Sequence, residues 1–164
     1  MGDPYRKLAP EMAVGSRAMI RHLELKNSIT HRILNDGTSA TTLLIGRTAL
    51  DRILIALFLL RERLADRLVL TDRNKKLTMT ALTHLQFGTY ETSNEEFTAC
   101  LTGTELELIS SFLLKYHRDS EAEVDHIDVE LDSGNSNRAT LIIRAENARP
   151  PMTGDEAKRL LDLG

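Results

Sequence analysis

Apolar positions in the first part of the chain recur at helical spacing. After Pro10, which suits the first turn of a helix, they fall mostly three, four or seven positions apart. This pattern predicts a helix over roughly residues 11–34, with an apolar face made of Met12, Met19, Ile20, Leu23, Ile33 and Leu34.

A second helix is predicted after the breaker Asn-Asp-Gly-Thr at 35–38. Four leucines then recur every seven residues. Three residues after each of the first three leucines comes a member of a second series, and such a double series is typical of the seam of a helical bundle. One preceding helix covers only part of this seam, so we expect a homodimeric four-helix bundle. The turn of the hairpin lies either at 36–37 or at Gly46. The two series are Leu43, Leu50, Leu57, Leu64 and Gly46, Ile53, Leu60.

The second part of the chain predicts strands and shorter helices. Residues 95–101, 126–132 and 139–145 alternate apolar and polar side chains, as half-buried strands do, and a turn over 133–137 joins the last two. Residues 72–94 are irregular or weakly strand-like. Capping boxes of the Thr-x-x-Glu type predict one helix from Thr104 and another from Thr153. The first helix has the predicted apolar face Leu106, Ile109, Leu113 and Tyr116.

These elements predict an α+β chain of two parts. Residues 1–70 form the helical hairpin, and residues 71–164 form a small β-α-β-β-α domain. The composition is that of a globular protein, with 41% hydrophobic and 27% charged residues. Aromatic residues make up only 4%, so the core must be aliphatic.

Cysteine usage and hydropathy predict a cytoplasmic protein outside the membrane. Cys100 is the only cysteine, which excludes an internal disulfide. The longest apolar run, residues 53–60, is far shorter than the roughly 20 residues that cross a bilayer. Arg17, Arg21 and Glu24 interrupt the first apolar stretch, so no secretory signal is expected.

The charge is unevenly distributed along the chain. Residues 1–90 contain 14 Lys and Arg against 8 Asp and Glu, whereas residues 91–164 contain 7 against 16. The two parts are either solvated surfaces of opposite sign, or the acidic part docks a basic partner or the basic part of another copy. Binding to nucleic acid is not expected, because no zinc-ligand spacing or aromatic interleaving accompanies the basic residues.

Several segments resemble the core of bacterial histidine kinases, in which a dimerising hairpin with a phosphoacceptor histidine precedes an ATPase module of the Bergerat type. His22-Leu23-Glu24-Leu25-Lys26-Asn27 resembles the phosphoacceptor box, and Thr30-His31-Arg32-Ile33-Leu34-Asn35 resembles its version in HWE-like kinases. In the second part, 106–117, 127–131, 140–148 and 152–156 resemble successive segments of the ATPase module. The resemblance implies a histidine phosphotransferase-like homodimer that exchanges phosphoryl groups with response-regulator receiver domains.

The departures from this family predict that the chain binds no ATP or other cofactor. The helix over 105–117 has no asparagine to hold Mg²⁺, and Glu146 occupies the place of the base-binding aspartate. Ala148 and Arg149 occupy the places of glycines that let the backbone approach a triphosphate. A degenerate ATPase module is therefore expected.

His22 and His31 are the candidate catalytic residues. Phosphotransfer needs an exposed histidine on a rigid helix, with positive charge nearby for the phosphoryl group. Arg21 and Lys26 flank His22, and Arg32 follows His31. Each histidine could equally be an ordinary exposed helix residue.

Two further patterns each have a simple structural interpretation. His126, Asp128, Glu130 and Asp132 share one face of a predicted strand and could hold a divalent metal, but a solvated charged sheet face explains them without one. Arg17 and His22 match the Arg-x4-His spacing of HEPN-type ribonucleases, a spacing short enough to occur by chance. No metal site is predicted.

Two main hypotheses of function follow from the sequence. The first is the phosphotransferase-like relay. The second is a non-catalytic dimeric module of the same fold that binds a protein partner. A third, an α+β adaptor unrelated to histidine kinases, would make the resemblance coincidental.

Overall fold

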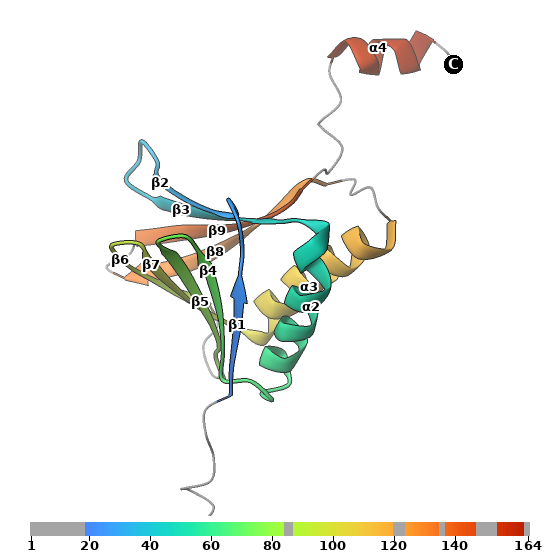
Figure 1. Ribbon diagram of the computed structural model, residues 1–164. Helices are drawn as coiled ribbons and strands as arrows, with labels where there is room; N and C mark the ends of the chain where they lie inside the picture. Colours follow the sequence, from blue (N-terminus) through green and yellow to red (C-terminus); the bar gives the residue numbers. More distant parts are fainter. Residues whose placement is uncertain (1–18, 84–86, 120–123, 135–136, 147–153, 163–164) are drawn as a thin grey trace, which may run out of the picture.

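The chain folds around one mixed sheet of nine strands (Figure 1). The computed structural model describes residues 19–83, 87–119, 124–134, 137–146 and 154–162. The predicted helical hairpin is wrong, because residues 20–45 form three strands. Without that hairpin there is no four-helix bundle, and the resemblance to a histidine kinase core is contradicted.

The described elements run from an N-terminal strand to a C-terminal helix. In chain order they are β1 (Ile20–Glu24), β2 (Ile29–Ile33), β3 (Ser39–Ile45), α2 (Arg47–Arg61), β4 (Arg67–Asp72), β5 (Lys75–Ala81), β6 (Thr89–Ser93), β7 (Glu96–Leu101), α3 (Gly103–Asp119), β8 (His126–Gly134), β9 (Asn137–Ala145) and α4 (Gly154–Asp162). The strand order across the sheet is β1-β4-β5-β7-β6-β8-β9-β3-β2. Strands from both parts of the chain therefore belong to one sheet, with those of the first part at its two ends and those of the second part between them. Position 70 lies within β4.

Two structural repeats make up most of the sheet. The segments β2-β3-α2-β4-β5 and β6-β7-α3-β8-β9 each consist of a hairpin, a helix and a second hairpin. β5, the last strand of the first repeat, pairs in parallel with β7, the strand before the helix of the second repeat. In the same way, β9 at the end of the second repeat pairs in parallel with β3 of the first. The repeats are thus related by an approximate two-fold arrangement, which no sequence similarity predicts.

The pairing registers show which residues of the two repeats are equivalent. Ile45 and Leu101, the last residues of the strands before the helices, pair with Ala145 and Ala81. In the second hairpin of each repeat, the residue two before this alanine is Met79 or Ile143. Met79 pairs with Leu68 of β4, and Ile143 pairs with Ile127 of β8. Leu68 and Ile127 therefore occupy equivalent places in the two repeats. Residues 67–71 of β4 therefore correspond to residues 126–130 of β8.

The predicted breaker at 35–38 is a β-hairpin turn rather than a turn between helices. The Leu34 N–H donates to the Thr38 carbonyl, and Asp36 Oδ1 accepts hydrogen bonds from the backbone N–H and the hydroxyl of Thr38. Gly37 has a φ of 82°, a left-handed conformation that glycine adopts without strain. The strand that follows, Ser-Ala-Thr-Thr-Leu-Leu-Ile, contains two threonines and an isoleucine, whose β-branched side chains suit a sheet.

The leucine heptad is not a dimer seam. Leu43 lies in β3, and Leu50 and Leu57 lie in α2 beyond the helix boundary at Gly46, so the spacing of seven crosses two kinds of structure. These three side chains are at most 3% exposed in the core of the chain itself. Leu64, which follows α2, is 57% exposed. The apolar spacing reflects two elements packing on one core.

The predicted β-α-β-β-α domain of the second part is wrong, because residues 72–94 contain the two further strands β5 and β6 and all strands join one sheet. Its individually predicted strands and helices are confirmed. Strands lie at β7, β8 and β9, and α3 buries the predicted Leu106, Ile109, Leu113 and Tyr116. The capping threonine lies two residues earlier than predicted, because Thr102 and Glu105 form the capping box and the helix begins at Gly103. The Thr102 N–H donates to Glu105 over 2.8 Å, and the Glu105 N–H donates to the Thr102 hydroxyl over 3.3 Å.

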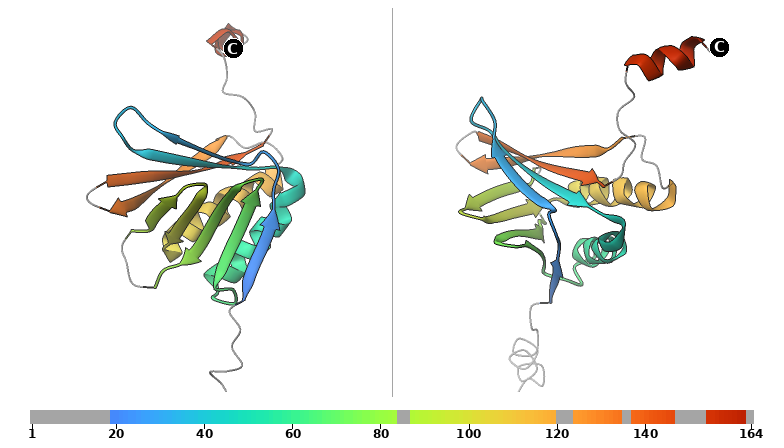
Figure 2. Two further views of the ribbon diagram at one scale, coloured as in Figure 1. Left: turned by 60° about the vertical axis from the view of Figure 1, so that its left-hand side comes forward. Right: turned by 45° about the horizontal axis from the view of Figure 1, so that its top comes forward.

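The two long helices lie side by side on one side of the sheet (Figure 2). His117 Nε2 in α3 lies 3.0 Å from a carboxylate oxygen of Asp51 in α2, at their exposed surface. The core beneath them is aliphatic, as predicted, with Tyr90, Phe97 and Tyr116 as its buried aromatic side chains among the described residues.

A buried carboxylate joins the two ends of the strand order. The side chain of Asp72, which ends β4 and is 4% exposed, accepts the backbone N–H groups of Asn27, Ser28 and Ile29 over 2.9, 2.6 and 2.9 Å. Burial acts to raise the pKa of Asp72, but these three donors and Arg73 outweigh it and hold that pKa below its usual value. Asp72 thereby fixes the corner between β1 and β2.

Candidate functional site

The two predicted phosphoacceptor histidines lie on strands, not on a helix. His22 is exposed on β1, where its Nε2 lies 3.1 Å from the Thr71 hydroxyl of β4. His31 is on β2, at the other end of the strand order. No described contact joins the two rings. The HEPN-type pair also lacks support, since Arg17 lies outside the described residues.

His31 belongs to a polar chain that enters the core. Its Nδ1 lies 2.9 Å from the Thr41 hydroxyl, which in turn bonds to the Tyr90 hydroxyl. Its ring lies 4.8 Å from that of Phe97, measured between centroids. Burial lowers the pKa of His31, and the charge of Glu95 opposes this effect. These contacts give His31 a structural role whether or not it accepts phosphate.

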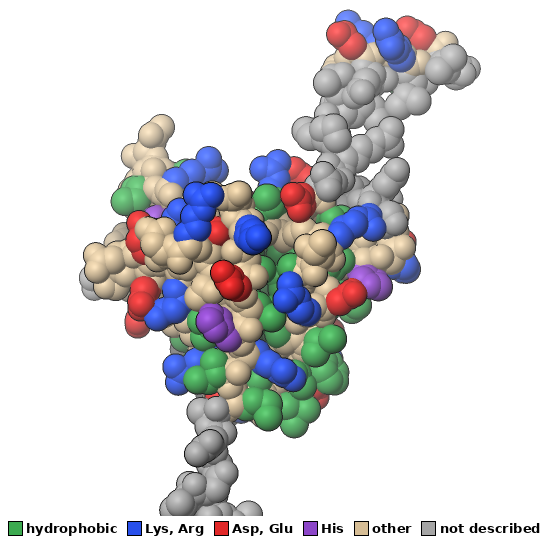
Figure 3. All heavy atoms as spheres, in the orientation of Figure 1, with side chains coloured by type: hydrophobic (Ala, Val, Ile, Leu, Met, Phe, Trp, Pro, Cys, Tyr) green, Lys and Arg blue, Asp and Glu red, His purple; other side chains and the backbone are tan. Residues whose placement is uncertain are grey.

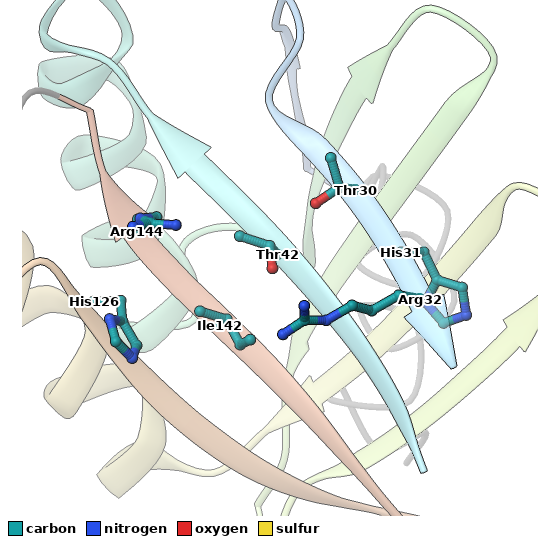
Figure 4. Close-up of a pocket in the computed structure, with 7 residues that line it drawn as sticks. All are labelled: Thr30, His31, Arg32, Thr42, His126, Ile142 and Arg144. Carbon is teal, nitrogen blue, oxygen red and sulfur yellow. The ribbon is translucent and has the colours of Figure 1, made fainter. Parts of the chain in front are cut away.

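A shallow hollow of about 350 Å³ lies on the face formed by β2, β3, β9 and β8 (Figure 4). Two threonine hydroxyls stand in it on neighbouring strands, and the side chain of Arg32 extends across it toward β9. Arg144 and His126 close the opposite end. The lining is thus Thr30, His31, Arg32, Thr42, His126, Ile142 and Arg144.

The charges in this hollow largely cancel. Asp125 lies 3.0 Å from Arg144 and 2.5 Å from His126 Nδ1, and His126 is also 3.8 Å from Asp128. The hydrogen bond from His126 is the main cause that holds the pKa of Asp125 below its usual value, against the effect of burial. Arg32 is left without an ion pair among the described residues. One exposed cation beside two hydroxyls makes a weak anion site, so we assign no function to it.

The acidic row on β8 is a charged sheet face. Glu130 pairs with Arg138 of β9 over 2.8 Å, and Asp132 accepts the Gly134 N–H. In the described part of the chain, no group of three or more His, Cys, Asp or Glu side chains could hold a metal ion.

A different feature of β8 is the open edge of its first half. Next to β9, β8 is paired along its whole length, but next to β6 it pairs only where Asp132 meets Thr89. The Asp132 N–H donates to the Gly88 carbonyl, away from β9, and alternate residues of an antiparallel pair point their backbone groups the same way. The N–H and C=O groups of His126, Asp128 and Glu130 therefore point to this edge, where no described residue bonds to them.

A groove of about 650 Å³ runs along the open edge. Residues 128–132 of β8 line it together with the side chains of Phe87 and Leu108, which are 68% and 48% exposed. Four carboxylates line it against one arginine: Glu105, Asp128, Glu130, Asp132 and Arg138. The groove thus offers backbone hydrogen bonds, apolar contact and negative charge.

The equivalent edge of the other repeat is occupied. There β1 lies parallel to β4 over five residue pairs, from Ile20 with Arg67 to Glu24 with Thr71. Because residues 67–71 correspond to 126–130, β1 covers in one repeat an edge that the described residues leave open in the other. This site was not predicted from the sequence, in which its signals are the acidic alternation of 126–132 and the excess of negative charge after residue 90.

Exposed apolar side chains are also visible over α2 at the lower right of Figure 3. Among the exposed apolar residues of α2 are Ile55 and Phe58, at 57% and 52% exposure, and neither lines the hollow or the groove described above. No described helix is long and apolar enough to span a membrane.

Comparison with known proteins gives no family for this chain. No protein-family model matches it. No curated protein matches its sequence either. Its function is therefore argued from its own residues.

Proposed function

We propose that this chain is a non-catalytic module that binds an extended segment of a partner protein by adding it to the open edge of β8. The observation that supports this most is the run of backbone N–H and C=O groups along a groove to which no residue in the described ranges bonds. A segment laid there gains main-chain hydrogen bonds, while side-chain contacts with the groove provide selectivity. Open strand edges invite such pairing, and proteins usually cover or blunt them.

Phosphoryl relay through His22 or His31 stays an untested prediction. Its argument required a histidine on a rigid helix of a bundle, and the structure removes that premise. The predicted homodimer through the leucine heptad loses its basis as well, because three of those leucines are buried within one chain. The binding module expected from the sequence had the same dimeric hairpin fold and loses that premise too, whereas the module proposed here requires neither a phosphoacceptor histidine nor that dimer.

Selection from a displayed library of random peptides tests the proposal, using the protein and an Asp128→Pro variant. Proline at 128 removes an N–H that points to the open edge and leaves the hydrogen bonds to β9 intact. We expect peptides that bind the parent and lose binding to the variant, while circular dichroism shows both folded. Failure to select any peptide, or selection of peptides that bind both proteins equally, would contradict the proposal.

A further inference from the structure

From the contrast between the two repeats, we infer that the segment bound at β8 runs parallel to it and alternates cationic with apolar side chains. This inference rests on the proposed function and adds direction and chemistry to it. The occupant is a segment of a partner protein rather than a second copy of this chain.

The direction follows from two neighbours of the site. In the equivalent place, β1 runs parallel to β4, with residues 20–24 beside 67–71. At the site itself, β6 already pairs with β8 in parallel, at Thr89 and Asp132. A bound segment in line with β6 and on its N-terminal side would continue that pairing along 126–130. Both the repeat and the adjoining strand therefore favour a parallel segment.

The length is set by the open edge. Residues 126–130 offer as many positions as β1 occupies on β4, where five residue pairs form. At about 3.3 Å per residue this is a segment of roughly 16 Å. Past it, the hydrogen bond between Asp132 and Gly88 closes the edge.

The alternation follows from the two faces of β8. Asp128 and Glu130 are exposed on the outer face, whereas Ile127 is half-buried and Val129 buried on the inner face. Side chains on the same face of neighbouring strands contact each other, and opposite charges there are favourable. The outer positions of the segment should therefore be Lys or Arg, and its inner positions should be apolar and approach Leu108 and Phe87. Glu130 keeps its pairing with Arg138 in the free protein, so a cation competes for it.

β1 of a second copy is the competing occupant. It is itself an edge strand, but its sequence places Arg21 and Leu23 on one face and Ile20, His22 and Glu24 on the other. Neither face is uniformly cationic or apolar, and Glu24 would meet the acidic row of β8. Charge complementarity thus favours a partner with regular alternation.

The test uses three synthetic peptides with the alternations Lys-Val, Thr-Val and Glu-Val, titrated into isotopically labelled protein and followed by NMR. We expect the Lys-Val peptide to shift and protect the Asp128 and Glu130 amides, and to bind about 10-fold or more tightly than the Glu-Val peptide at low salt. The difference should shrink at high salt. In an Asp128→Asn/Glu130→Gln variant it should also shrink, but not in the control Glu24→Gln, which removes a carboxylate on β1.

Spin labels decide the direction. A label at the N-terminus of the Lys-Val peptide should broaden His126 most, and one at the C-terminus should broaden Glu130 most. The reverse pattern, or equal binding of the Lys-Val and Glu-Val peptides, would overturn this inference while leaving the proposed function standing. If no peptide affects these amides, the proposed function itself fails. If the protein self-associates and Asp128→Pro abolishes this association, the occupant of the edge is a second copy of the chain, and the inference is overturned.

Discussion

Replacing Asp72 with Asn should strongly destabilise the fold. The carboxylate accepts three backbone N–H groups, with Ser28 and Ile29 sharing one oxygen and Asn27 using the other. In the Asp72→Asn variant the side-chain amide has only one acceptor oxygen, and its NH₂ group faces a backbone N–H donor. At least one of the three hydrogen bonds to the charged carboxylate is therefore lost. Such bonds contribute about 1.5–3 kcal/mol each, and an unpaired buried donor costs about 1–3 kcal/mol more.

We therefore expect the free energy of unfolding to fall by about 2–5 kcal/mol, a large part of the roughly 5–15 kcal/mol of a typical domain. Urea unfolding at pH 7 measures this directly. Asp66→Asn is the matched control, since Asp66 accepts the single N–H of Met19 at the exposed start of β1 and should cost less than about 1 kcal/mol. Equal stability of Asp72→Asn and the parent would refute the role assigned to this corner.

The pH dependence gives a second check on Asp72. Its folded pKa lies below the unfolded value of about 3.9, so its contribution is fully present above that pH and is lost as the pH falls through the folded pKa. The gap in stability between parent and Asp72→Asn should therefore be constant near neutrality and shrink in acid. A gap that widens below pH 4 would contradict this assignment.

Three further predictions concern β6, β8 and the histidines. Gly88→Ala should lower the melting temperature markedly, because an added Cβ would lie 2.6 Å from the Cys100 carbonyl oxygen; an unchanged melting curve would be contrary to this packing. Asp128→Pro should stay folded by circular dichroism while Val129→Pro unfolds, since only the N–H of residue 129 points to β9; equal effects would mean that the edge is misassigned. His31→Gln should lower the melting temperature of the protein more than His22→Gln does. If the protein carries acid-labile phosphate and either substitution abolishes it, the relay hypothesis would be supported again.

The sequence predicted local elements where the pattern depended on one element alone. The face of α3 shows 3.6-residue spacing within a single capped helix, and β8 and β9 alternate without interruption. The prediction for the first part of the chain was wrong because apolar residues of different elements happen to follow one heptad spacing. Leu43 on β3 and Leu50 on α2 stand seven apart, yet the helix boundary lies between them.

The site could not be predicted because it depends on which strands become neighbours. The alternation of 126–132 predicts a strand but not that β6 pairs with it at one end only. The same holds for β1, whose polar side chains gave no hint that it covers β4. The excess of acidic residues after position 90 left open either a solvated acidic surface or a basic partner, and only the second alternative is consistent with the proposed use of the groove.

Amide hydrogen exchange of the free protein tests the central claim most directly. The open edge predicts that the Asp128 and Glu130 amides exchange rapidly, while Ile127 and Val129, bonded to β9, are protected. Val69 and Thr71, the equivalent residues of β4, provide the internal control, because β1 covers them and they should exchange slowly. Equal protection of Asp128 and Val69 would show that the edge of β8 is already covered and would contradict the account.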